Sequence, residues 1–116
     1  MNGNAPVELW GTGSPLREFL HVDDLARAVY FTLRKDLKGN LYNVGFGKDI
    51  TIKDLAELVK SIVNYQGSIF WDKSKPDGTP KKLMNSQKIM SEGWRPEIIL
   101  ESGIRSTYEW YQNEYR

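Results

Sequence analysis

The residues with the clearest potential for chemistry lie in one stretch, 10–24, where a glycine-rich loop leads into a single arginine and an acidic helix start. Arg17 follows the loop 11–15, and glycines let a backbone turn sharply or pass close to a ligand. A guanidinium in this position can make a bidentate charged contact with a phosphate or a carboxylate. The residue types equally allow a surface ion pair between Arg17 and Glu18 or Asp23, so both interpretations stay open.

Further side chains are candidates for ligand contacts. Trp10, before the loop, could stack on a base or sugar, although core packing is the commoner fate of a tryptophan at a strand end. Asp77 lies in a Pro-Asp-Gly turn, where an aspartate more often shapes the turn than contacts a ligand. Lys81 and Lys82 are adjacent and should point in different directions. One of them could reach an anion, although solvation of both is the commoner outcome.

Arrangements typical of catalytic and metal sites are missing from the sequence. His21 is the only histidine, and the absence of cysteine excludes disulfides, thiolate zinc sites and cysteine nucleophiles. We therefore interpret His21 as structural and predict no catalytic residue and no metal ligand. The glycine loops do not match the G-x-G-x-x-G pattern and no Tyr-x-x-x-Lys pair occurs, so we expect this chain to bind no cofactor.

Length and charge limit the functional classes further. The chain of 116 residues predicts a single domain, 1–116, and a formal net charge of +1 argues against a strongly basic nucleic-acid-binding protein. No apolar run approaches the roughly 20 residues that span a bilayer, and residues 1–6 carry no signal-peptide core. We expect a cytoplasmic protein that contacts neither nucleic acid nor membrane.

Alternating strands and helices must position the candidate residues. The patterns predict strands at 7–10, 18–22, 41–44 and 68–71, a loop at 72–82, and helices at 24–35, 52–64, 85–92 and 101–112. Asp23 or Asp24 is the expected N-cap of the first helix, and Thr51 of the second. The last helix is expected to bury Ile104, Thr107, Tyr108 and Tyr111. This order predicts an α/β fold in which helices cover one small mixed sheet.

Several segments together resemble one enzyme family. They are 10–24 (WGTGSPLREFLHVDD), 43–45 (NVG) and 75–83 (KPDGTPKKL), and the segment 106–111 (STYEWY) is similar to the same family's last helix. Over essentially its whole length the chain resembles the carboxy-terminal, substrate-binding part of the GDP-L-fucose synthases. These enzymes are extended short-chain dehydrogenases/reductases. The REFxHVDD signature is shared among sugar-nucleotide members, and the KPDGTP loop narrows the resemblance to this family.

The resemblance implies the substrate-binding portion of an NADP-dependent enzyme. Members of this family are 3,5-epimerases and 4-reductases that convert GDP-4-keto-6-deoxy-mannose into GDP-L-fucose. Their Rossmann domain, Ser-Tyr-Lys centre and epimerising Cys and His would precede this chain, so the resemblance predicts GDP-sugar binding without activity. Lys81 departs from the arginine that is frequent in relatives. The family's pocket residues correspond to Trp10, Arg17, Asp77 and Lys82.

By this match Arg17 and Lys82 would neutralise a pyrophosphate, Trp10 would pack on a ring, and Asp77 would accept a hydrogen bond from a sugar hydroxyl or a base. Two alternatives stay open. The chain could be part of another sugar-nucleotide epimerase or dehydratase that uses a different nucleotide. It could instead be a non-enzymatic oligomerisation or interaction module, because the helix at 24–35 is apolar on more than one side, which favours a homo-oligomer.

Overall fold

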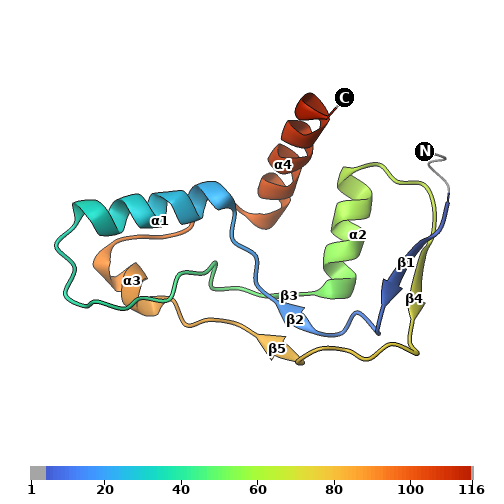
Figure 1. The fold of residues 1–116 in the computed structure, drawn as a ribbon, viewed down its shortest axis with the longest axis horizontal. Coiled ribbons are helices and arrows are strands. Elements are labelled where there is room, and N and C mark those ends of the chain that lie inside the picture. The colour runs from blue at the N-terminus through green and yellow to red at the C-terminus, as the bar shows by residue number, and fades with distance from the viewer. Residues whose placement is uncertain (1–4, 116) are drawn as a thin grey trace.

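The described part of the chain forms two small sheets, whereas the sequence predicted one (Figure 1). The computed structural model describes residues 5–115. In this part β1 (Val7–Trp10) pairs in parallel with β4 (Ile69–Asp72). In the second sheet β2 (Leu16–Arg17) lies between β3 (Ile50–Thr51), which is antiparallel to it, and β5 (Lys81–Lys82), which is parallel. The α/β class and the mixed strand directions are confirmed, and β3 and β5 were not predicted.

Four helices in the described range confirm the predicted helical segments. They are α1 (Val22–Arg34), α2 (Ile52–Ile62), α3 (Gln87–Glu92) and α4 (Leu100–Glu114). Each end lies within two residues of its prediction, because periodic apolar positions fix a helix better than they fix its ends. None of these helices has the length and apolar character that crossing a membrane requires.

The predictions of strands at 18–22 and 41–44 were wrong. The strand begins earlier, at Leu16, because Leu16 and Arg17 have partner strands on both sides. No described strand pairs with 41–44, which therefore runs as irregular chain. The apolar pattern of that segment has another cause, since Tyr42 and Val44 pack against the buried core.

The N-cap of α1 is His21 rather than Asp23 or Asp24. Its Nδ1 atom accepts a hydrogen bond from the backbone N–H of Asp23 at 3.1 Å. With Nδ1 as the acceptor, the ring proton lies on Nε2, which is 3.2 Å from the Ser106 hydroxyl of α4. The geometry gives His21 a structural role, because the ring joins the start of α1 to α4.

Asp24 connects α1 to the segment that precedes α4. Its fully buried carboxylate accepts hydrogen bonds from the backbone N–H groups of Glu97 (3.1 and 3.2 Å) and Ile98 (3.0 Å), and from the guanidinium of Arg27. Burial acts to raise the pKa of Asp24, but the hydrogen bonds from Arg27, Ile98 and Glu97 outweigh burial and hold the pKa below its ordinary value. The carboxylate is therefore charged at neutral pH.

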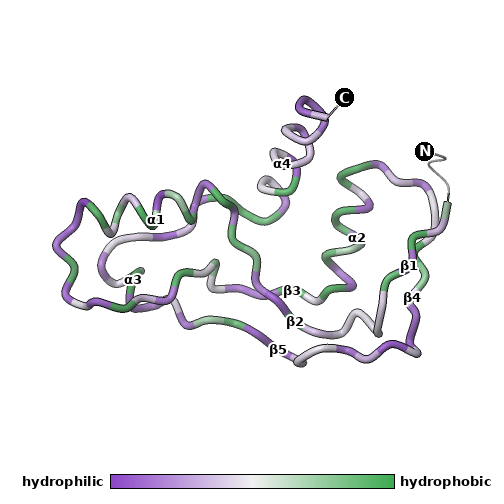
Figure 2. Tube along the Cα trace, in the orientation of Figure 1, coloured by the Kyte–Doolittle hydropathy of each residue, from purple (hydrophilic) through white to green (hydrophobic). Residues whose placement is uncertain are grey.

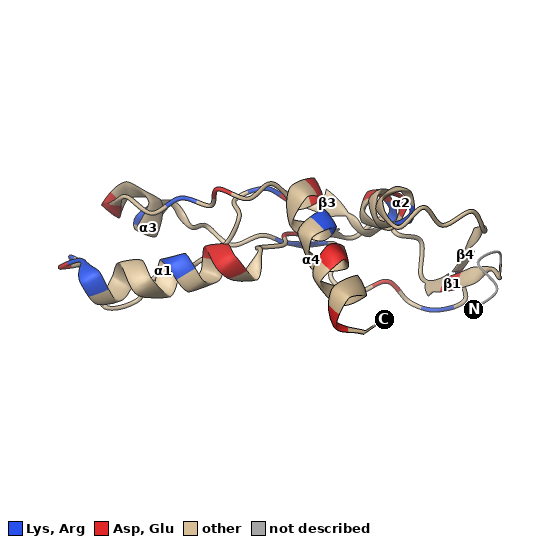
Figure 3. Cartoon of the chain, turned by 90° about the horizontal axis from the view of Figure 1, so that it is seen from above, with Lys and Arg blue, Asp and Glu red and all other residues tan. Residues whose placement is uncertain are grey.

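The buried apolar core is small and lies between α1 and α3. Within residues 5–115 it consists of Ala28, Ile89 and Trp94, with partly buried neighbours around them. The radius of gyration is 17.2 Å and the extents are 52 × 35 × 17 Å, whereas a compact domain of about 100 residues has a radius near ~13 Å. Figure 3 shows the resulting flat shape, with α1 and α3 at one end and β1 and β4 at the other.

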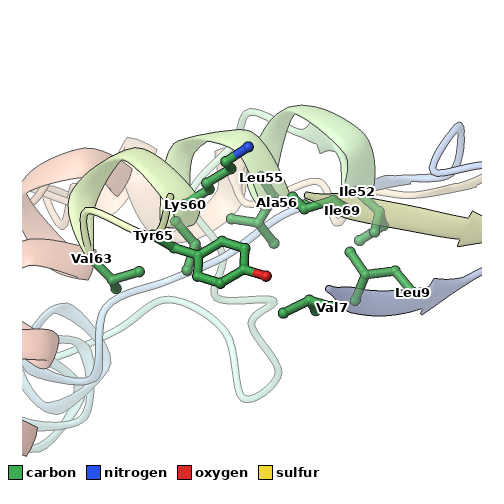
Figure 4. A pocket seen from close by; sticks show the side chains of 10 residues that line it. Val7, Leu9, Ile52, Leu55, Ala56, Lys60, Val63, Tyr65 and Ile69 are labelled. Carbon is green, nitrogen blue, oxygen red and sulfur yellow. The ribbon is translucent and has the colours of Figure 1, made fainter. Parts of the chain in front are cut away.

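Apolar residues are spread along the molecule instead of meeting at one centre (Figure 2). The apolar stripe predicted on α2 does face β1 and β4, but across an open groove of about 440 Å³ whose walls include Val7, Leu55 and Ile69 (Figure 4). No residue of α2 is buried. This elongated arrangement leaves the hydrophobic faces available for contact with another surface.

The burial predicted for α4 was wrong in part. Ile104 and Tyr108 are half-buried, while Thr107 is exposed and Tyr111 is 55% exposed. The reason is that α4 and α2 flank a second groove, of about 570 Å³, instead of packing against a filled core. A helix buries its apolar face only where a second surface covers it.

Thr51 caps α2 as predicted, and the cap provides a test of local stability. Its hydroxyl oxygen accepts a hydrogen bond from the backbone N–H of Asp54 at 3.1 Å. We expect Thr51→Ala to lower the free energy of unfolding by about 1 kcal/mol. The exposed Lys53→Ala on the first turn is the control and should change it by less than about 0.5 kcal/mol. Urea unfolding followed by circular dichroism measures both, and equal stabilities would contradict the cap.

Candidate functional site

Pairing of β2 with β5 brings two cationic residues together. Arg17 and Lys82 are partners in the parallel register, so their side chains leave the sheet on the same face. The backbone N–H of Leu16 also donates to the carbonyl of Pro80 at 2.9 Å, which fixes the end of the loop 73–80 beside β2. These contacts join segments that are far apart in the sequence.

The guanidinium of Arg17 lies against the loop 73–80. Its Nη1 donates to the carbonyl of Leu16 at 2.7 Å, and a Cβ atom built on Gly78 would lie 3.1 Å from its Nη2. Among residues 5–115 Arg17 forms no ion pair, so the alternative of pairing with Glu18 or Asp23 is not realised. The guanidinium keeps donors for an anionic ligand.

The carboxylate of Glu18 has a structural role. It accepts hydrogen bonds from the backbone N–H groups of Gly47 at 3.0 Å and Met84 at 2.9 Å. Gly45 is buried beside it, and a Cβ atom there would lie 2.6 Å from a carboxylate oxygen. Glu18 therefore holds the second glycine loop against the chain that follows β5.

The two adjacent lysines separate as the sequence suggested, and the structure distinguishes them. Lys81 Nζ lies 3.6 Å from the Asp49 carboxylate. Lys82 is exposed beside Arg17 and makes no ion pair with any residue that the structure describes. Lys82 is therefore the lysine that is placed to reach an anion together with Arg17.

Trp10 lies at the surface, so the alternative of core packing is wrong. Its side chain is at the end of β1, and the residue is 69% exposed. Lys75 Nζ lies 5.2 Å from the centroid of the ring, a cation–π distance. An exposed tryptophan can stack on the planar ring of a base or on a sugar ring. A cation beside it favours a ligand that also carries negative charge.

Asp77 is held by Thr12 of the first glycine loop. Its Oδ1 accepts from the backbone N–H of Thr12 at 2.8 Å, and its Oδ2 lies 2.7 Å from the Thr12 hydroxyl. The hydroxyl and then the backbone N–H of Thr12 lower the pKa of Asp77 below its ordinary value. Thr12 and Lys75 were missed by the sequence analysis, because no local pattern marks a contact between residues that are distant along the chain.

The site therefore contains the four predicted residues on neighbouring segments. Arg17 and Lys82 share a face of the second sheet. Asp77 directly precedes Gly78, which lies beside the Arg17 guanidinium. Trp10 directly precedes the glycine loop whose Thr12 binds Asp77. Cations, an exposed indole and a carboxylate acceptor suit a ligand that combines phosphate groups, a ring and hydroxyls.

The glycine loops do not fit a dinucleotide. The backbone N–H of Thr12 is already bound by the Asp77 carboxylate, and that of Gly47 by the Glu18 carboxylate. A strand, not a helix, follows the first loop, so the amide groups of a helix N-terminus are not available to a pyrophosphate there. No step involving NADP can be assigned to these loops.

The chain is similar to known proteins over most of its length. Residues 1–45 match the model of the NAD dependent epimerase/dehydratase family. The chain is 58% identical over 107 residues to a probable GDP-L-fucose synthase 1 of Oryza sativa subsp. japonica, covering 92% of this chain and 33% of that protein. The chain is homologous to the GDP-L-fucose synthases. It spans about a third of the length of the curated relatives it matches.

About a third of each of two solved GDP-sugar enzymes has the same fold as this chain. A GDP-6-OMe-4-keto-L-xylo-heptose reductase from C. jejuni superposes with a TM-score of 0.85 at 41% identity, covering 94% of this chain and 34% of the reductase. A GDP-L-fucose synthetase from Naegleria fowleri, bound to NADP, gives a TM-score of 0.85 at 25% identity, with coverage of 95% and 35%. Both are extended short-chain dehydrogenase/reductase folds, as the sequence predicted.

Proposed function

We propose that residues 1–116 form a GDP-sugar-binding domain that serves the NADP-dependent conversion of GDP-4-keto-6-deoxy-mannose into GDP-L-fucose. The observation that carries this proposal is the in-register pairing of Arg17 with Lys82, which places on one face of the sheet two cations that have no carboxylate partner among residues 5–115. Homology to the GDP-L-fucose synthases supports GDP as the nucleotide. Residues 1–4 and 116 of the proposed domain lie outside the described part of the chain.

Each site residue has a role that its chemistry supports. Arg17 and Lys82 neutralise the diphosphate, for which a planar guanidinium provides paired donors and an ammonium a point charge. Trp10 packs on the base or sugar ring with its exposed indole. Asp77 accepts a hydrogen bond from a sugar hydroxyl or the base, through lone pairs that Thr12 leaves free.

The chemistry of epimerisation and reduction would be completed outside this chain. The glycine loops are occupied by Asp77 and Glu18, which supports placing NADP on another domain. The two open apolar grooves beside α2 are suited to receive that domain, because covering them would remove exposed hydrophobic surface from water. NADP, when bound there, would supply the hydride, while this domain binds and orients the GDP-sugar.

Calorimetric titration of the purified chain with GDP-fucose, GDP, a UDP-sugar and NADPH tests this proposal. We expect the two GDP ligands to bind weakly, NADPH not to bind, and the chain alone to show no reductase activity. Reductase activity of the pure chain, or tighter binding of the UDP-sugar, would contradict the proposal. The second result would favour an enzyme that uses another nucleotide.

The alternative of a non-enzymatic interaction module rests on the open hydrophobic faces. Tyr30 and Leu33 on α1 are exposed in addition to the residues of the grooves. Concentration-dependent dimerisation in analytical ultracentrifugation, with no binding of any nucleotide, would favour this alternative. The homo-oligomer and the cytoplasmic location stay predictions.

A further inference from the structure

Hydrogen bonds between Thr12 and Asp77 join two loops of the candidate site. The backbone N–H of Thr12 donates to Asp77 Oδ1 at 2.8 Å, and the Thr12 hydroxyl lies 2.7 Å from Asp77 Oδ2. Both carboxylate oxygens are therefore engaged by one residue, 65 positions away in the sequence. Such two-point binding fixes the plane of the carboxylate as well as its position.

The direction of the hydroxyl bond follows from the surroundings of Thr12. Its Oγ1 lies 3.2 Å from the backbone nitrogen of Ser14 and 2.8 Å from the Ser14 hydroxyl. A hydroxyl has one proton, and the carboxylate is the stronger acceptor, so Thr12 donates to Asp77 and accepts from Ser14. The first glycine loop thus orients the hydroxyl toward Asp77.

The glycine before Thr12 is adapted to this contact. Gly11 has a φ of +87°, which disfavours other residues, and a Cβ atom there would collide with the Asp77 carboxylate. The backbone N–H of Gly11 also donates to the carbonyl of Asp72 at 3.0 Å, at the start of the loop 73–80. Carboxylate and glycine loop can therefore approach closely only because position 11 has no side chain.

Hydrogen bonds attach the loop 73–80 to the rest of the described molecule at three places, and Lys75 of this loop also lies over the Trp10 ring. The two ends of the loop are held by backbone bonds, Gly11 to Asp72 and Leu16 to Pro80. Every residue of the loop is exposed. Between its two ends, the hydrogen bonds that join the loop to a distant segment are those between Thr12 and Asp77. Without this contact the middle of the loop, including Gly78 beside Arg17, would keep only the exposed cation–π contact of Lys75 with Trp10, and we expect it to move more freely relative to the sheet.

We infer that Thr12 is a positioning residue of the site, which clamps the Asp77 carboxylate and thereby holds the loop 73–80 closed beside Arg17. This deepens the proposed function and rests on it for the identity of the ligand. Thr12 acts through Asp77, whose carboxylate it holds in one orientation. A loop held in this way needs less ordering when a ligand binds.

The test compares wild type with Thr12→Val, which removes the hydroxyl at nearly constant shape, and Thr12→Ser, which retains it. Two measurements need no ligand: NMR titration of the Asp77 side-chain carboxyl carbon, and heteronuclear relaxation of the amides of residues 73–79 other than Pro76. We expect Thr12→Val to raise the titration midpoint of Asp77 and to increase motion in the loop. Thr12→Ser should resemble wild type, because its hydroxyl can donate in the same way.

Binding of GDP is measured on the same three proteins. We expect Thr12→Val to weaken binding by about tenfold and Thr12→Ser by less than about twofold. An unchanged Asp77 midpoint and unchanged loop motion in Thr12→Val would overturn the inference. If wild type binds no GDP, the proposed function fails, and the two ligand-free measurements still decide whether Thr12 clamps the loop.

Discussion

Replacing Arg17 with alanine is expected to weaken the binding of GDP to this chain by about 10- to 100-fold. Arg17 is in register with Lys82, forms no ion pair with any described residue, and lies beside Gly78 with donors unused. Its removal leaves Lys82 as the single cation on this face of the second sheet. A diphosphate would then lose the only planar pair of donors at the site.

Two further variants separate charge from geometry. Arg17→Lys keeps the positive charge but loses the guanidinium fork, so it should weaken binding by an intermediate factor. Arg34→Ala removes an equal charge at the far end of α1, where Arg34 lies over the ring of Tyr30, and should change the affinity by less than about twofold. Isothermal calorimetry with GDP measures all of them. Equal affinities for Arg17→Ala and Arg34→Ala would contradict the site.

The second large effect concerns folding. Asp24→Ala is expected to lower the free energy of unfolding by about 3 kcal/mol, because it leaves the part-buried N–H groups of Glu97 and Ile98 without their acceptor and removes the buried carboxylate that pairs with Arg27. Asp23→Ala, one position before Asp24 on α1, is the matched control. The Asp23 side chain is 74% exposed, so its replacement should change stability by less than about 0.5 kcal/mol. Urea unfolding at pH 7 measures the difference.

The pH dependence of the Asp24 variant provides an independent check. Because the folded-state pKa of Asp24 lies below its ordinary value of 3.8, its contribution to stability is complete above that value. The contribution is lost as the pH falls from 3.8 through the lower pKa of the folded state. The stability difference between wild type and Asp24→Ala should therefore be constant from about pH 7 to 5 and narrow below about pH 4. If the stability difference between the two proteins disappears already near pH 6, a group other than Asp24 causes the pH dependence.

The sequence predicted the features that depend on neighbours along the chain. Helices such as α2 follow from apolar residues on one stripe, and the Thr51 cap follows from a hydroxyl three residues before the N–H that it binds. The segments 10–24, 43–45, 75–83 and 106–111 also identified the homologous family correctly, and the same match suggested Trp10, Arg17, Asp77 and Lys82 as the pocket residues. Their side-chain chemistry was sufficient to suggest a ligand with phosphates and a ring.

Only the tertiary structure decided which of these residues meet. Strand pairing put Lys82 beside Arg17 and directed Lys81 to Asp49, although the two lysines are neighbours with the same chemistry. The bond from Thr12 to Asp77 likewise joins loops that have no common local pattern. The same holds for Asp24, which resembled a helix cap and instead binds the distant N–H groups before α4. Helical periodicity and helix caps depend on residues a few positions apart and can therefore be predicted from the sequence. Strand register and loop contacts depend on how distant segments pack together.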